Sequence, residues 1–212
     1  MKTFWGNVVL ILLIFWVGCS KNSTKPGDEG QTDAEIKAEV IKLIEEGWGA
    51  FESGDYATAV NLFTDAVVKE NGKFDTLRAE ALGGRGWSRI YLGEFQKAYN
   101  DFDGANRLDI SPELRRDIYA GLGMVFNARN MYPNSVTILT VLLNEDPNYQ
   151  FSHRTAVNAF RLRLLVAQGY FVLGEFTKVA FHLDILEPAQ APHDPNDPEG
   201  LLQAIERLRT VQ

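Results

Sequence analysis

The chain has 212 residues, a net charge of −7 and 45% hydrophobic residues, which suits one globular domain with a sizeable core. Its acidic residues are spread along the sequence without a basic cluster, which argues against nucleic acid and against broad attraction to anionic lipid headgroups. The single cysteine, Cys19, excludes a disulfide framework within one molecule.

The first 18 residues have the pattern of an export signal. An unbroken apolar run over residues 8–17 follows Lys2 and leads directly into Gly18 and Cys19. The run is too short to span a bilayer comfortably, and its position is that of a secretory hydrophobic region. The segment 17–19 resembles the lipobox of bacterial lipoproteins, although Trp16 stands where that family usually has Leu.

The lipobox resemblance implies that Cys19 becomes the acylated first residue of an exported, membrane-anchored lipoprotein. Ser20 is not an inner-membrane retention signal in that family, so a source with two membranes would place the protein on the outer membrane, facing the periplasm. An ordinary cleaved signal and an uncleaved N-terminal anchor are the alternatives, and both also put the chain outside the cytoplasm. Residues 19–32 are polar, and we expect them to form a flexible tether.

From residue 33 onward, apolar residues recur at helical spacing, and we predict nine helices and no sheet. The first helix begins at a capping box over residues 32–35 and ends before residue 53. The remaining helices are expected over residues 56–69, 75–92, 95–108, from 112, from 132 to the turn at 146–148, 152–173, 176–186 and 201–210.

One pattern returns four times: a small residue, a turn residue seven positions later, an aromatic residue two positions after that, and small or apolar residues at fixed offsets. The first two copies are 39 residues apart at every position. Such a period indicates a solenoid, because each unit buries its apolar face only against its neighbours. The copies are Gly47, Gly54, Tyr56, Ala59, Phe63, Ala66; Gly86, Gly93, Phe95, Ala98, Phe102, Ala105; Gly123, Asn130, Tyr132, Ser135, Leu139, Leu142; and Ala167, Gly174, Phe176, Val179, Leu183, Leu186.

Each copy resembles a tetratricopeptide (TPR) repeat, most closely in the first two copies. The resemblance implies an all-α, right-handed solenoid of four helical hairpins and a C-terminal capping helix. The copies are 39, 37 and 44 residues apart, which exceeds the family's usual 34, and the extra length falls at residues 71–76, 108–113 and 149–155. The domain is predicted over residues 33–212, with repeats at about 40–73, 79–112, 116–149 and 160–193 and a cap at 198–211.

Small residues at fixed positions are expected to bring the helices together, and Phe63 and Phe102 to fill the wedge toward the next repeat. Burial of one such ring contributes roughly 1.5–3 kcal/mol. The predicted repeat-packing residues are Gly47, Ala59, Phe63, Ala66, Gly86, Ala98, Phe102, Ala105 and Gly123.

The TPR resemblance also implies that the first helices of the repeats line a concave groove that binds another protein or peptide. Trp48 and Trp87 occupy equivalent positions, and aromatic side chains along a groove suit a peptide with apolar anchors. Alternatively, both tryptophans belong to the core, because the longer repeats tighten the superhelix and close the groove. The predicted groove residues are Ile44, Trp48, Phe51, Trp87, Ile90, Tyr91, Met124, Asn127, Leu164, Gln168 and Phe171.

Two arginine pairs are the most prominent cationic groups. Arg85 and Arg89 lie four residues apart and either clamp a partner's carboxylate or form an ion pair between repeats, since Glu46 is the equivalent of Arg85 in the first repeat. We favour the ion pair. Arg161 and Arg163 are expected to lie on a solvated face.

No motif for catalysis, a cofactor or a metal stands out. His153, His182 and His193 lack the spacing of a helical metal site, and the acidic loop at 194–199 lacks the EF-hand order. We therefore predict a non-enzymatic lipoprotein scaffold or assembly factor for other proteins, without cofactors. The alternatives are a structural domain that multimerises, or a small-ligand binder or enzyme with a site inside the superhelix.

Overall fold

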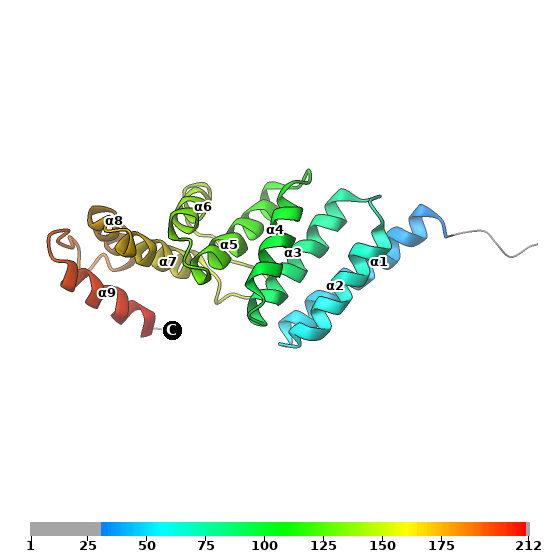
Figure 1. Ribbon diagram of the computed structural model, residues 1–212, viewed down its shortest axis with the longest axis horizontal. Coiled ribbons are helices and arrows are strands. Elements are labelled where there is room, and N and C mark those ends of the chain that lie inside the picture. The colour runs from blue at the N-terminus through cyan, green and yellow to red at the C-terminus, as the bar shows by residue number, and fades with distance from the viewer. Residues whose placement is uncertain (1–30, 211–212) are drawn as a thin grey trace, which may run out of the picture. The chain divides into compact units, whose positions relative to one another are not determined.

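The computed structural model describes residues 31–210, and the signal and lipidation predictions lie outside this range, as does nearly all of the tether. In these residues nine α-helices follow one another in chain order (Figure 1). Their bounds are α1 Asp33–Glu52, α2 Tyr56–Glu70, α3 Asp75–Tyr91, α4 Phe95–Asn106, α5 Pro112–Ala128, α6 Tyr132–Glu145, α7 Ala159–Val172, α8 Phe176–Leu186 and α9 Pro198–Thr210.

The helices form two layers, as expected for a solenoid of hairpins. Helices α1, α3, α5, α7 and α9 contact one another in sequence and make the inner layer. Helices α2, α4, α6 and α8 make the outer layer, and each packs against the inner helices on either side of it. The all-α, TPR-like fold class is therefore confirmed, and within residues 31–210 the only β pairing is an isolated bridge between Gln150 and Asn158.

Helix starts follow the capping signals in the sequence. Thr32 and Glu35 form the capping box at the start of α1, and the Ser111 side chain accepts the backbone N–H of Leu114, with Pro112 at the first position of α5. These contacts satisfy N–H groups that have no partner within the helix. The local sequence thus sets where these helices begin.

The turn inside each hairpin needs a left-handed backbone. Gly54, Gly93 and Gly174 have φ values of 85°, 74° and 74°, and Asn130 has a φ of 59° in the third repeat. Glycine adopts this region without a steric penalty, and Asn tolerates it better than most residues. The repeating turn residue is therefore required by backbone conformation, not by side-chain contact.

An outer-layer aromatic ring sits between two inner helices at each of the first two repeat junctions. A Cβ atom on Gly47 would lie 2.8 Å from the Phe63 ring, and Gly84 of the next repeat leaves no room for one on the other side of that ring. Phe102 repeats this arrangement between Gly86 and Gly121. The predicted repeat-packing residues are all buried: Gly47, Ala59, Phe63, Ala66, Gly86, Ala98, Phe102, Ala105 and Gly123.

Helix α9 covers the end of the array. Leu201, Ala204, Ile205 and Leu208 are buried in a separate apolar cluster with residues of α7 and α8. This is the role expected of a capping helix, which hides the apolar face of the last repeat. No helix in the described range is long and apolar enough to cross a membrane.

One predicted helix starts in the wrong place. The helix expected from residue 152 begins only at Ala159, where the Asn158 side chain accepts the backbone N–H of Arg161. Residues 149–158, which we call the docked loop, contain turns and no helix. In Figure 1 this yellow segment runs back from α6 toward the inner helices of the earlier repeats. Phe151 and Val157 are buried there, so tertiary packing overrides helical periodicity.

Candidate functional site

The docked loop fills the concave side of the first two repeats. The Phe151 ring stacks on Trp87 with a centroid separation of 4.3 Å, and the His153 ring stacks on Trp48 at 3.7 Å. Phe151 is 1% exposed and Trp87 is also 1% exposed. The loop therefore occupies the place that a bound peptide would take in an open groove.

Polar contacts fix the loop to three different helices. The His153 ring nitrogen Nδ1 lies 2.8 Å from a carboxylate oxygen of Glu52 at the end of α1. The Tyr149 hydroxyl donates to Asp117 of α5 over 2.8 Å. Arg154 donates to the Tyr56 hydroxyl over 2.6 Å. These contacts cross about a hundred residues of sequence in two cases, so the loop ties the third repeat back to the first.

The loop explains why part of the predicted groove is core. Ile44, Phe51 and Trp87 are at most 3% exposed, and Trp48 is 9% exposed. Both tryptophans thus belong to the core, which is the alternative that the sequence analysis left open. Ile90 is half-buried against the same core. These side chains offer little surface to a partner while the loop is docked. Their role in binding stays a prediction.

The concave side is open farther along the chain. A hollow of about 610 Å³ lies between α3, α5, α7, α9 and the docked loop. A second hollow of about 260 Å³ continues along α7 toward α9 and shares Asn127, Gln168 and Arg209 with the first. We call the two together the open groove. It brings together six of the predicted groove residues: Tyr91, Met124, Asn127, Leu164, Gln168 and Phe171.

Several lining residues were not predicted as groove residues. Arg154, Ala156 and Val157 come from the docked loop, and Arg209 comes from the capping helix. The extra length between the third and fourth repeats was the available signal for the loop residues. The sequence holds no corresponding signal for Arg209, because only packing of α9 against α7 brings it to the groove.

The solvated face predicted for Arg161 and Arg163 is wrong. Both side chains are half-buried, and Arg161 lines the first hollow. Arg163 lies on the other side of α7, where its guanidinium is 3.4 Å from Nδ1 of His182. Burial and the nearby Arg163 charge lower the pKa of His182 to about 4. This histidine is therefore uncharged at neutral pH.

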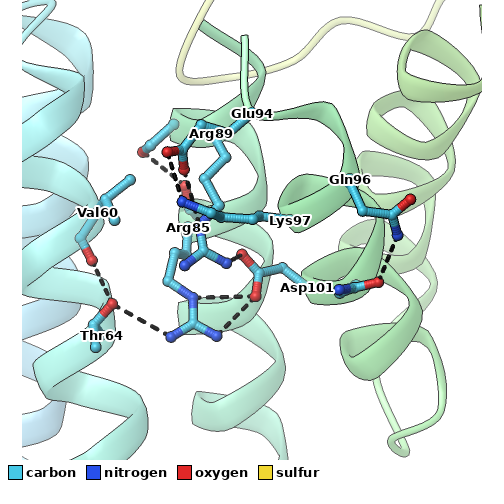
Figure 2. A network of polar contacts seen from close by, with 11 residues as sticks. Val60, Thr64, Arg85, Arg89, Glu94, Gln96, Lys97 and Asp101 are labelled. Carbon is cyan, nitrogen blue, oxygen red and sulfur yellow. Dashed lines mark hydrogen bonds and ion pairs between the residues drawn. The ribbon is translucent and has the colours of Figure 1, made fainter. Parts of the chain in front are cut away.

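Arg85 and Arg89 are engaged within their own repeat (Figure 2). Both guanidinium groups bind the buried carboxylate of Asp101 on α4, Arg85 over 2.7 Å. Arg85 also donates to the Thr64 hydroxyl of the first repeat over 3.3 Å. The arginines therefore form an ion pair, but it lies within the second repeat and not between repeats as expected, and Glu46 of the first repeat pairs with Lys42. The Asp101 contacts leave neither arginine placed as a free clamp.

Two carboxyl groups near the docked loop have perturbed pKa values. Burial raises the pKa of Asp117 although the Tyr149 hydroxyl donates to it, and burial also raises the pKa of Glu80. Such shifts are typical of catalytic acids and bases. The cavity beside Asp117 measures about 10 Å³, which leaves no room there for a substrate. Burial is the main cause of both shifts.

The three histidines have different partners. His153, His182 and His193 contact Glu52, Arg163 and Asp184, respectively. Over residues 31–210 no three His, Cys, Asp or Glu side chains gather in an arrangement that would hold a metal ion. In the open groove, three arginines line the first hollow beside apolar side chains, and Glu206 lines the second hollow.

Comparison with known proteins supports the fold. No protein-family model and no curated protein matches this chain. Among solved structures, a tetratricopeptide repeat protein from Parabacteroides merdae matches over 81% of this chain with a TM-score of 0.58 and 15% identity. This chain spans 60% of that structure.

Two further solved structures are similar to this chain. MamA from AMB-1 matches with a TM-score of 0.59 and 14% identity, covering 82% of this chain and 99% of its own. A thermophilic TPR protein from Thermus thermophilus matches with a TM-score of 0.52 and 20% identity, covering 80% of each chain. At these identities the likeness concerns the fold, and the fold of this chain is that of TPR proteins.

Proposed function

We propose that this protein is a membrane-tethered TPR scaffold or assembly factor that binds a segment of another protein in the open groove. The observation that carries the proposal is the continuity of the two hollows along α7. A compact ligand needs one pocket, whereas an extended peptide needs an elongated surface with successive side-chain sites. The MamA and Parabacteroides merdae structures add the analogy of fold alone.

Site-specific photocrosslinking in cells tests the groove. A photoreactive residue replaces Ala156, which is exposed and lines the first hollow. The control position is Lys97 on the outer helix α4, whose side chain is 60% exposed. We expect a discrete adduct with another protein from position 156 and none from position 97. The same adduct from both positions, or none from either, would contradict the proposal.

The tether is the second part of the proposal and rests on the sequence around Cys19. Its test is metabolic labelling with a radioactive fatty acid, followed by membrane fractionation. Wild type and the control Ser20→Ala should carry label and sediment with membranes, whereas Cys19→Ser should lose both properties. Label that persists in Cys19→Ser would show that the lipid is attached elsewhere or that the signal acts differently.

A structural domain that multimerises through the same surface is the competing function. Light scattering of the full chain in detergent separates the two proposals. A monomer leaves the open groove available to a different protein. A dimer that dissociates on Ala156→Trp, and not on the exposed neighbouring change Thr155→Trp, would assign the groove to self-association instead.

A further inference from the structure

Contacts between the helices of this array reach only the neighbouring repeat. Among the described helices, α1 contacts only α2 and α3, and α3 contacts no helix beyond α5. The curvature of a solenoid is the sum of small rotations from one repeat to the next. Contacts between neighbours alone therefore hold the overall curvature weakly, and a segment that spans several repeats holds it more firmly.

The docked loop is such a segment. It follows α6 of the third repeat, yet its side chains reach the first. His153 contacts Glu52 across 101 positions of sequence, and Arg154 contacts the Tyr56 hydroxyl across 98 positions. Between these ends the loop lies on Trp87 of the second repeat. The loop therefore connects three repeats along the concave side.

The backbone of the docked loop is closed on itself. The Phe151 N–H donates to the Val157 carbonyl over 2.9 Å, and the Ala159 N–H donates to the Tyr149 carbonyl over 2.7 Å. Over residues 31–210, no backbone hydrogen bond joins this loop to α1–α5. A compact loop whose ends are held together can leave a surface as one body. Its undocking then breaks side-chain contacts and keeps the backbone hydrogen bonds.

Docking also has costs that oppose the aromatic contacts. The Trp87 indole N–H is buried without an acceptor where Phe151 stacks on the ring. Burial raises the pKa of Glu80 and of Asp117, because it disfavours their charged forms. Water reaches these groups when the loop leaves, which recovers part of the lost contact energy. Release of the loop is therefore expected to cost less free energy than unfolding of the array.

We propose that the docked loop is a releasable strap. When docked, it holds the first two repeats at one curvature relative to α5. When released, it lets the first repeat turn away from the later ones. The same loop supplies Arg154, Ala156 and Val157 to the wall of the first hollow, so release also changes the shape of the open groove. This device concerns the shape of the array and does not depend on what occupies that groove.

Exchange of the Trp87 indole N–H, measured by nuclear magnetic resonance on the full chain in detergent, tests the release. This N–H meets water when Phe151 leaves, whereas the Trp87 backbone N–H lies inside α3 and needs the helix to open. After correction for intrinsic rates, the indole N–H should exchange at least about tenfold faster than the backbone N–H. Equal rates would mean that the loop leaves only on global unfolding, and the strap would not be releasable.

The distance between spin labels at Lys42 on α1 and Lys178 on α8 tests the effect on curvature. Their side chains are 74% and 52% exposed, and double electron–electron resonance gives the distance distribution. His153→Ala combined with Arg154→Ala removes both contacts of the loop with the first repeat. The distribution should broaden and its mean should shift relative to wild type.

A second variant removes the same contacts from the opposite side. Glu52→Ala with Tyr56→Phe deletes both acceptors and keeps the ring that stacks on Tyr91, so the distribution should change in the same way. The control Asn148→Ala with Thr155→Ala alters two exposed side chains in and beside the loop and should leave it unchanged. Circular dichroism selects the variants that keep wild-type helicity. An unchanged distribution in a folded variant, or an equal change in the control, would show that the loop does not set the curvature.

Discussion

The two halves of the concave side use the same helical scaffold with different results. Over the first two repeats, Trp48 and Trp87 are covered by the docked loop and become core. Over the later repeats, Met124 and Gln168 occupy matching groove positions and line an open hollow. A position in the repeat therefore does not decide whether a side chain meets a partner, because a segment between repeats decides what covers it.

The largest loss of stability is expected in the first two repeats, where the docked loop fills the concave side. Phe151→Ala removes a buried ring that stacks on Trp87, and we expect the free energy of unfolding to fall by about 3–4 kcal/mol. Urea unfolding followed by circular dichroism measures it. Phe181→Ala is the matched control, since Phe181 is 60% exposed and its loss should cost less than about 0.5 kcal/mol. Similar costs for both changes would mean that the loop is not part of the core.

The second-largest loss of stability is expected from the ion pairs around Asp101 in the second repeat. Asp101→Asn leaves the guanidinium groups of Arg85 and Arg89 without their carboxylate. Breaking a buried pair costs ~3–5 kcal/mol, and partial exposure of both arginines reduces the expected loss to about 2 kcal/mol. Thermal unfolding compares it with Asp103→Asn on the same helix, where the pair with Arg107 is largely exposed. An equal shift in the two variants would contradict a structural role for the Asp101 cluster.

A smaller loss is expected in the open half. Met124 is half-buried and faces the hollow, so Met124→Ala should lower the free energy of unfolding by only about 1 kcal/mol, below the range for fully buried methionines. The same urea experiment measures it beside Phe151→Ala. A loss as large as that of Phe151→Ala would indicate that the hollow is closed in solution and that the contrast between the two halves is smaller than the structure indicates.

The smallest effect is a pH dependence at the capping helix. Hydrogen bonds from His193 lower the pKa of Asp184, and Arg207 lowers that of Glu187. A lowered carboxyl pKa favours the folded state above the ordinary pKa, and this contribution is lost as pH falls through the lowered value. The protection of α9 amides against hydrogen exchange, relative to the intrinsic exchange rate at each pH, should therefore fall below about pH 4. Asp184→Asn should remove part of this dependence, and an unchanged profile would contradict the assignment.

Most of the fold was predictable because its determinants are local and repeat. The capping box at Thr32, the left-handed turn at Gly54 and the ring of Phe63 between glycines each act within a few turns of helix or between adjacent repeats. The candidate site was predictable only in part. Tyr91 and Asn127 line the open groove as expected, but Arg154 and Arg209 reach it from segments that a repeat pattern does not describe.

The sequence by itself determined that this protein is a solenoid of four helical hairpins, where eight of the nine described helices begin, and which small residues let those helices meet. Only the tertiary structure decided which part of the concave side is open. The reason is that the docked loop gains its stability from contacts with Trp48, Trp87 and Asp117, residues distant in sequence. Their combined burial outweighs the local preference for helix at residues 152–158.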